Sequence, residues 1–317
     1  MNKSRFAAAL KENSIAKLSQ LAKSDLHSHA GRGGKLSYIE KYAGVTIAPP
    51  SKPFASLDEM NGWFNDHIKR HLPAGKSGYL KRVEASFAQA AADHVKVLAL
   101  SYGIDEVLGL GGIDSFILQM NDLHQTYAPE TDFYPDLDIY SQDGTAYLDE
   151  IYERNWFNAI DIINYDHRLS IDEMKHICRR AQSKGLVLKA HIGEFSSADE
   201  VMQYAEELAL DEIQHGVTAA SSPQIMKWLS NHGIQLNVCP TSNIMLGVCG
   251  SYQTHPIRTL YDYGVRVTIN TDDLLIFNST LSEEYLHLFQ AGLMNADELY
   301  DICQAGLLHR YKKRASL

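Results

Sequence analysis

The stretch VLKAHIGE, Val187–Glu194, has the pattern of a short buried strand that ends in residues able to do chemistry. Amphipathic helical patterns flank it, over Ser170–Lys184 before it and over Ser197–Leu210 after it, and Ser170 is suited to cap the first of them. A near-continuous apolar run between two such helices is typical of a strand in a parallel sheet, which is covered on both faces. The stretch therefore predicts one repeat of an α/β fold.

Seven further runs of this kind occur along the chain. They cover Ser24–His29, Val95–Leu100, Phe133–Tyr140, Phe157–Asn164, Glu212–Val217, Gln235–Thr241 and Arg266–Asp273. Eight strands that alternate with helices favour closure of the parallel sheet into a barrel. We therefore predict a (β/α)8 TIM barrel that forms a single domain over residues 1–317.

The connection between the first and second predicted strands is unusually long. It covers approximately residues 30–94 and contains helical patterns but no obvious core of its own. Long connections in compact folds usually form lids or binding elements. We predict that this segment is a helical insertion that lies over the barrel mouth like a lid.

The composition is that of an ordinary globular protein, since 45% of the residues are hydrophobic and 21% are charged. The formal charge of −10 and the lack of a long Lys/Arg block argue against a surface that coats nucleic acid. No run of apolar residues is long enough to span a membrane. The four cysteines form no C-x-x-C pair, which favours a reduced compartment. We predict a cytoplasmic protein that binds neither nucleic acid nor membrane; the sequence predicts no oligomeric state.

Histidine and acidic residues stand at the ends of several predicted strands, which a barrel brings together at its active-site face. His27 and His29 close the first strand, and residues i and i+2 of a strand point to the same side, so both can bind one ion. His191 stands near the end of the fifth strand and Asp272 near the end of the eighth. Three imidazoles and a carboxylate suit Zn²⁺, although Fe, Mn or Co also occupy such sites. Each pattern alone has a structural explanation, and their joint occurrence predicts a metal centre.

Several motifs occur in a specific order towards the C-terminus. They are HIGE, HGV, VCPTSNIMLGV (Val238–Val248), HPIRTLYDYGVRVTINTDD (His255–Asp273) and LSEEY (Leu281–Tyr285). Together with DLHSH near the N-terminus, they make the chain similar to the adenosine deaminase family, within the metal-dependent amidohydrolase superfamily. The segment from about Ala30 to Leu186 matches only loosely, mainly at FYPDLDIY and FNAIDIIN.

The resemblance implies one zinc ion per chain, held by residues from both ends of the barrel. These residues are His27, His29, His191 and Asp272. A protein-bound Zn²⁺ brings the pKa of its water to near 7 and so supplies hydroxide at neutral pH. Hydroxide adds to the carbon that carries the amino group, and loss of ammonia converts an amino-purine into an oxo-purine.

Three catalytic roles also follow from the resemblance. Glu194 matches the glutamate that protonates the ring nitrogen beside the attacked carbon, which requires a carboxyl kept protonated by its surroundings. His215 matches the histidine that orients or deprotonates the attacking water. Asp273 matches the aspartate that holds the resulting hydroxide in line.

Four residues are predicted to bind the substrate, and some of them depart from the family pattern. The four are Gly31, Arg32, Asn164 and Gly193. Gly31 stands where the family has an acidic residue that contacts the sugar hydroxyl, and Asn164 stands where it has a glycine that approaches the purine. Arg32 and Lys35 are either a receptor for a phosphate or another anion, or two solvated charges on a loop.

The sequence thus predicts zinc-dependent hydrolytic deamination of adenosine or a related 6-aminopurine nucleoside. The alternatives are deamination of adenine, AMP, a modified nucleoside or another amino-heterocycle, hydrolysis of a cyclic amide or ester, and a non-catalytic purine-binding homologue. In each enzymatic case the partners are a small molecule and water.

Overall fold

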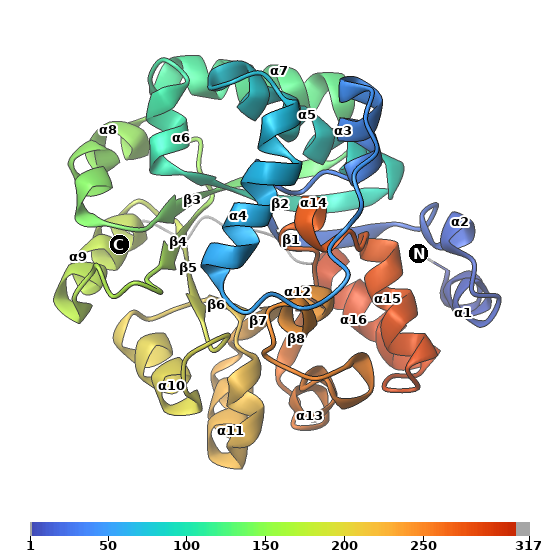
Figure 1. Ribbon diagram of the computed structural model, residues 1–317. Helices are drawn as coiled ribbons and strands as arrows, with labels where there is room; N and C mark the ends of the chain where they lie inside the picture. The colour runs from blue at the N-terminus through green and yellow to red at the C-terminus, as the bar shows by residue number, and fades with distance from the viewer. Residues whose placement is uncertain (1, 309–317) are drawn as a thin grey trace.

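The computed structural model describes residues 2–308, so Met1 and residues 309–317 of the predicted domain lie outside the described part. Eight parallel strands follow one another around a barrel in chain order (Figure 1). The strands are β1 (Lys23–His29), β2 (Val95–Gly103), β3 (Asp132–Ile139), β4 (Ala159–Ile163), β5 (Val187–Ile192), β6 (Glu212–His215), β7 (Gln235–Val238) and β8 (Arg266–Ile269). The predicted (β/α)8 barrel is therefore confirmed.

The barrel closes between its last and first strands. Ser28 and Asp272 form a parallel bridge, and the Asp272 amide donates to the carbonyl oxygen of His27 at 2.9 Å. The amide oxygen of the Asn270 side chain accepts from the backbone N–H of Leu26 at 2.8 Å. These contacts hold the two ends of the chain together at the mouth of the barrel.

Helices surround the sheet on its outer side (Figure 1). Those between successive strands include α5 (Lys76–Ala92), α6 (Ile104–Gly109), α7 (Ile113–Tyr127), α8 (Leu148–Glu153), α9 (Ile171–Ser183), α10 (Ala198–Glu207), α11 (Pro223–His232), α12 (Pro240–Met245) and α13 (Ile257–Asp262). The chain begins with α1 (Lys3–Lys11) and α2 (Ile15–Leu18) and ends with α15 (Leu281–Gln290) and α16 (Ala296–Leu308). Capping boxes begin α9 and α10, where Ser170 pairs with Glu173 and Ser197 with Glu200.

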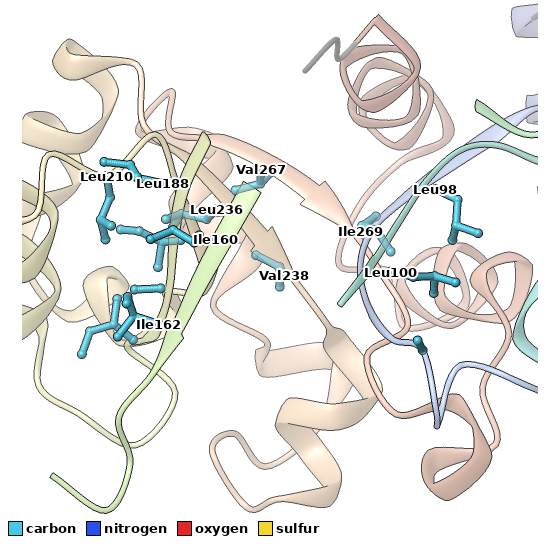
Figure 2. Packing of buried hydrophobic residues seen from close by; sticks show 14 of the residues in the cluster. Leu98, Leu100, Ile160, Ile162, Leu188, Leu210, Leu236, Val238, Val267 and Ile269 are labelled. Atoms are coloured by element: carbon cyan, nitrogen blue, oxygen red, sulfur yellow. The ribbon is translucent and has the colours of Figure 1, made fainter. Parts of the chain in front are cut away.

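The strands alternate between apolar and polar residues, whereas the sequence suggested near-continuous apolar runs. The apolar side chains form the core between sheet and helices, as Figure 2 shows for Ile160, Leu188 and Leu236. The polar side chains lie inside the barrel, where Lys189 donates to Asp136 at 2.7 Å and lies 3.3 Å from Glu212. Because such charged side chains pair with one another inside the barrel, the strands can carry polar residues at their inward-facing positions.

The segment between β1 and β2 forms α3 (Leu36–Ala43), α4 (Leu57–His67), the 3-10 turn η1 (Lys69–His71) and α5. In Figure 1, α4 crosses in front of the barrel. Phe64 of α4 shares a separate apolar cluster with Ile39 of α3 and Ile276 of α14 (Leu274–Phe277), which follows β8. No helix among residues 2–308 is long and apolar enough to cross a membrane.

Candidate active site

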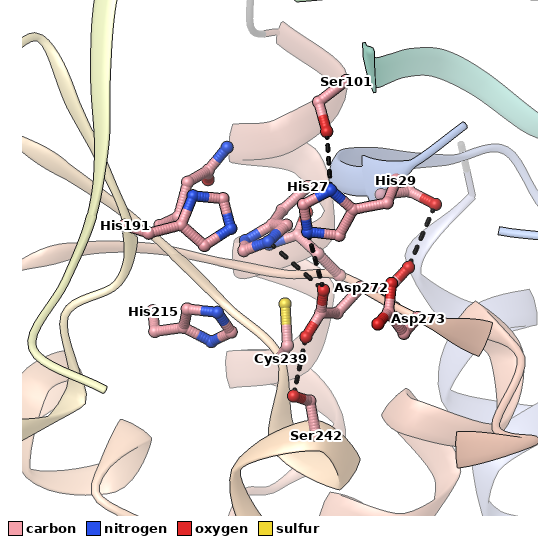
Figure 3. A network of polar contacts seen from close by, with 12 residues as sticks. His27, His29, Ser101, His191, His215, Cys239, Ser242, Asp272 and Asp273 are labelled. Atoms are coloured by element: carbon pink, nitrogen blue, oxygen red, sulfur yellow. Dashed lines mark hydrogen bonds and ion pairs between the residues drawn. The ribbon is translucent and has the colours of Figure 1, made fainter. Parts of the chain in front are cut away.

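The four predicted metal ligands meet at the mouth of the barrel (Figure 3). The Oδ1 atom of Asp272 lies 3.3 Å from Nε2 of His29 and 3.5 Å from Nε2 of His27. The ring of His191 lies 4.7 Å from the ring of His27, measured between centroids. Cys239 also has a donor atom close by, although its thiol is directed to the carbonyl oxygen of Asn237 at 3.8 Å.

Each of three predicted ligands has a polar neighbour that fixes its orientation. Asp161 of β4 lies 3.0 Å from Nδ1 of His191, and the Ser101 hydroxyl lies 2.9 Å from Nδ1 of His29. The Ser242 hydroxyl donates to Oδ2 of Asp272 at 2.7 Å. Metal-binding histidines and carboxylates typically have such partners, because these hold the ligand atom towards the ion.

Several nitrogen atoms of this cluster lack a hydrogen-bond partner among the described residues. Both ring nitrogens of His27 and the Nε2 atom of His191 are buried without a hydrogen bond. Leaving buried nitrogen atoms unsatisfied costs free energy, so such atoms indicate a missing partner. The donor set and its orientation fit a divalent zinc ion held by three imidazoles and one carboxylate.

Two site residues adopt a backbone conformation that non-glycine residues rarely take. His215 has φ of 63° and Asp272 has φ of 58°, both in the left-handed region. Each such residue costs on the order of 1–3 kcal/mol and persists only where its surroundings hold it. These turns end β6 and β8 before the ends that the sequence predicted, and they aim both side chains at the cluster.

Glu194 is a buried acid beside the predicted ligands. Burial, reinforced by the charge of Asp272, raises the pKa of Glu194 to about 8, so the carboxyl is protonated at neutral pH. The Tyr165 hydroxyl donates to Oε2 of Glu194 at 2.6 Å. The other oxygen, Oε1, is buried without a partner among residues 2–308, which leaves it available to a bound molecule.

A chain of hydrogen bonds fixes the protonation of His215. The Ile257 amide donates to Nδ1 of His255 at 3.1 Å, so the proton of this neutral imidazole lies on Nε2. Burial lowers the pKa of His255 to about 3, which keeps the ring neutral. The Nε2–H of His255 donates to the side-chain oxygen Oδ1 of Asn243 at 3.3 Å. This orients the side chain of Asn243, so its Nδ2 atom donates to Nδ1 of His215 at 3.2 Å.

His215 consequently carries its own proton on Nε2. Burial and the neighbouring imidazoles lower the pKa of His215 well below its usual value, so the ring is neutral. Its Nε2 atom lies 3.7 Å from Oε2 of Glu194. His215 thus presents an N–H donor to the space beside Glu194.

Asp273 is held at the opposite side of the cluster by a cation. Arg32 donates from Nη1 to Oδ2 of Asp273 at 2.7 Å and from Nη2 to Asn61 of α4 at 2.9 Å. The Oδ1 atom of Asp273 is buried and has no partner in the described part of the chain. It is an acceptor that a water molecule can use.

A cavity of about 410 Å³ opens from this cluster. Gly31 and Arg32 line it, as predicted for substrate-binding residues, whereas Asn164, Gly193 and Lys35 are not among its lining residues. Asn164 instead holds the loop after β4 through two hydrogen bonds with Leu169, of 2.9 and 3.0 Å.

Gly193 has a structural reason to be glycine. Its φ is +74°, and a Cβ there would lie 2.5 Å from Val201 and 2.9 Å from Gly216. This close approach lets β5 turn directly into the segment that carries Glu194.

Comparison with known proteins identifies the family. The family model described as adenosine deaminase matches residues 151–308. A protein of Treponema pallidum (strain Nichols), provisionally named adenosine/adenine deaminase, is 30% identical over 277 residues, which are 86% of this chain and 92% of that protein. The chain belongs to the adenosine deaminase family. This deaminase is a hydrolase that acts on C–N bonds, and its substrates are adenosine-, adenine- or AMP-like compounds.

Solved structures share the fold of this deaminase. An amidohydrolase from Burkholderia ambifaria with bound Zn has a TM-score of 0.75 at 19% identity, covering 94% of this chain and 88% of that one. The N6-methyl-AMP deaminase from Arabidopsis thaliana has a TM-score of 0.74 at 18% identity, covering 94% of both chains.

Several site residues of this deaminase were missed by the sequence reasoning. Asp161 had a detectable signal, because a lone charged residue in the apolar strand AIDII indicates a position inside the barrel. Asn243 and Ser242 lie in the motif VCPTSNIMLGV without any pattern that reveals their roles. Tyr165 follows β4 in a loop, and only the fold brings it to Glu194.

Proposed function

We propose that this deaminase catalyses the zinc-dependent hydrolytic deamination of a 6-aminopurine, releasing ammonia. The observation that carries the proposal is a buried Glu194 with a free oxygen beside three converging imidazoles. Burial raises the pKa of Glu194 to about 8, which favours its acid form. The zinc ion would be held by His27, His29, His191 and Asp272. When bound, it would supply hydroxide at neutral pH by lowering the pKa of a water molecule. The bound Zn of the Burkholderia ambifaria amidohydrolase supports this choice of metal.

The protein groups divide the proton transfers between them. Glu194 donates a proton from Oε1 to the purine ring nitrogen beside C6, which makes C6 more electrophilic. His215 donates a hydrogen bond from Nε2 to the attacking oxygen, because its proton already lies there. Asp273 accepts the proton of the attacking water at Oδ1, with Arg32 holding the carboxylate in place. Water adds at C6, and Asp273 returns the proton that it accepted to the amino group. The C6–N bond then breaks, ammonia leaves, and the proton of the new C6 hydroxyl restores the acid form of Glu194 as the C6 carbonyl forms.

Ammonia release from adenine, adenosine and AMP tests the proposal. We expect the zinc-loaded enzyme to deaminate at least one of them and Glu194→Gln to lose at least about 100-fold in kcat, since general acid catalysis contributes about that much. Tyr165→Phe is a matched control, since it removes the hydrogen bond to Oε2 but leaves the acid, and its loss should be smaller. Full activity of Glu194→Gln would contradict the assigned role.

A further inference from the structure

Three cations surround one aromatic ring at the rim of the catalytic cavity. The ring of Phe64 in α4 lies 4.8 Å from Cζ of Arg32, 5.3 Å from Cζ of Arg82 and 5.4 Å from Nζ of Lys69. All four residues line the cavity. The cations come from three separate segments, namely the loop after β1, η1 and α5. The fold therefore gathers positive charge at one place in a chain whose net charge is −10.

Two of these cations have no ion pair with a carboxylate among residues 2–308. Arg32 pairs with Asp273, but neither Arg82 nor Lys69 has such a partner. Arg82 is only 8% exposed, and its Nε atom lacks a hydrogen bond. A buried guanidinium without a counter-ion is costly, which indicates that an anion completes the cluster.

The nearby acid does not fill this role. Glu106 also lines the cavity, but it accepts from the Tyr79 hydroxyl at 2.8 Å and from the Gly103 amide at 3.0 Å. Burial raises the pKa of Glu106, which disfavours its charged form. Partial burial and the positive charges of Arg82 and Arg32 lower the pKa of Lys69, and the opposing effect of Glu106 is smaller.

Gly31 lies beside the guanidinium of Arg82 and has no side chain to cover it. A Cβ at this position would lie 3.6 Å from Nη2 of Arg82 and 3.1 Å from Cε2 of Tyr79. With glycine there, the positive charge faces the cavity.

The cations also border a second cavity further out. Lys69 and Arg82 line both cavities, and Arg70 lines the outer one. All charged residues among the described lining of the outer cavity are basic. Lys69 and Arg82 therefore stand between the catalytic cluster and an outer region that is also favourable to anions.

We propose that Arg82 and Lys69, beside Arg32, form a subsite for the phosphate of the substrate, so that the preferred substrate is a 6-aminopurine nucleoside monophosphate. This inference rests on the proposed deamination. A guanidinium binds phosphate through two parallel hydrogen bonds, and an ammonium adds a point charge. A dianion relieves the repulsion among the cations, whereas adenosine and adenine bring no charge to do so. The sequence suggested Arg32 and Lys35 as the receptor for an anion. Lys35 does not line the cavity, so in this proposal Arg82 and Lys69 take its place.

The ratio of kcat/KM for AMP to kcat/KM for adenosine tests the subsite. In Arg82→Gln and in Lys69→Gln of the zinc-loaded enzyme, we expect this ratio to fall about 10- to 100-fold, the loss of one charge-assisted hydrogen bond. The loss should be mainly in KM for AMP. Arg168→Gln is the matched control: Arg168 lines the same cavity but pairs with Asp166 at 2.9 Å, so the ratio should change less than about twofold.

Binding of inorganic phosphate gives a readout that needs no turnover. Calorimetric titration of the zinc-loaded wild type, Arg82→Gln and Lys69→Gln compares the same metal centre in all three, so a difference reports the cations. We expect phosphate affinity to weaken about 10-fold in each variant. Lys69 is exposed, so Lys69→Gln should fold even if thermal unfolding shows that Arg82→Gln does not.

The outcomes separate the subsite from the reaction. Equal phosphate affinity in wild type and variants, or an unchanged ratio in both variants, overturns the subsite. If the enzyme deaminates adenosine or adenine efficiently and turns over AMP no better, only the proposed preference for a monophosphate is overturned. No ammonia from AMP, adenosine or adenine overturns the proposed deamination, and the phosphate titration still decides whether the cations bind an anion.

Discussion

At the scale of single residues, the direction of the hydrogen bond between Asn243 and His215 is the most consequential detail. The backbone amide of Ile257 determines which nitrogen of His255 carries the proton. His255 in turn orients the side chain of Asn243, and Asn243 leaves the His215 proton on Nε2. In the proposed reaction, that position makes His215 a donor to the attacking oxygen and leaves proton acceptance to Asp273.

Asn243→Asp is expected to reverse this bond, since a carboxylate only accepts. The His215 proton would then move to Nδ1, and Nε2 would lose its donor function. We expect kcat to fall by about 10- to 1,000-fold, in the range for removing one donor at a developing charge. Zinc content, measured on the same samples, should stay at the wild-type level because no predicted ligand contacts Asn243. A variant with wild-type kcat would show that the His215 proton is not set by this route.

The sequence predicted the ligands and catalytic residues that the barrel brings together, and it predicted Arg32, but it did not predict the other two cations of the proposed subsite. His27, His29 and Asp272 stand at strand ends, where a periodicity of two and the barrel topology determine which side chains meet. Arg82 and Lys69 lie in the loosely matching segment between β1 and β2, on a helix and a short turn. Nothing in their local pattern distinguishes them from surface charges, and only packing against Phe64 brings them together.

At the scale of elements, local sequence rules determined where the helices begin. The capping residue predicted for α9 is confirmed: Ser170 accepts from the Glu173 amide, and Glu173 accepts in return from the Ser170 amide at 2.7 Å. Strand ends were less accurate, because the left-handed turns at His215 and Asp272 depend on tertiary contacts rather than on residue type.

Ser170→Ala is expected to lower the free energy of unfolding by about 1 kcal/mol, the usual cost of losing an N-cap. Urea denaturation of both proteins measures this difference. Ser183→Ala, at the other end of α9, is the control, since the Ser183 hydroxyl donates to the carbonyl oxygen of Arg180 within the same helix and caps no helix start. Equal losses in the two variants would mean that the helix start is held by packing and not by its cap.

At the scale of the whole molecule, the junction between β8 and β1, here called the seam, both closes the barrel and carries predicted metal ligands. Strands β2 and β3 pair over seven successive positions. The seam between β8 and β1 has a single bridge, between Ser28 and Asp272, and is otherwise held by separate hydrogen bonds such as those from Thr271 to Asp25. The predicted ligands His27, His29 and Asp272 lie on both sides of this seam. A zinc ion held there would join the two ends of the chain.

Removing zinc is therefore expected to loosen the seam more than the rest of the barrel. A ligand that binds only the folded state stabilises it by about 4 kcal/mol at a concentration 1,000 times its Kd, so chelation should lower the unfolding temperature and adding zinc should restore it. Amide hydrogen exchange locates the effect: without zinc, amides of β1 and β8 should exchange faster, while those of β2 and β3 should change little. The Asp272→Asn variant is the control, because its weakened site should make exchange at the seam nearly independent of added zinc. A uniform increase over all strands would instead show that the ion stabilises the barrel as one unit, and that the seam closes without it.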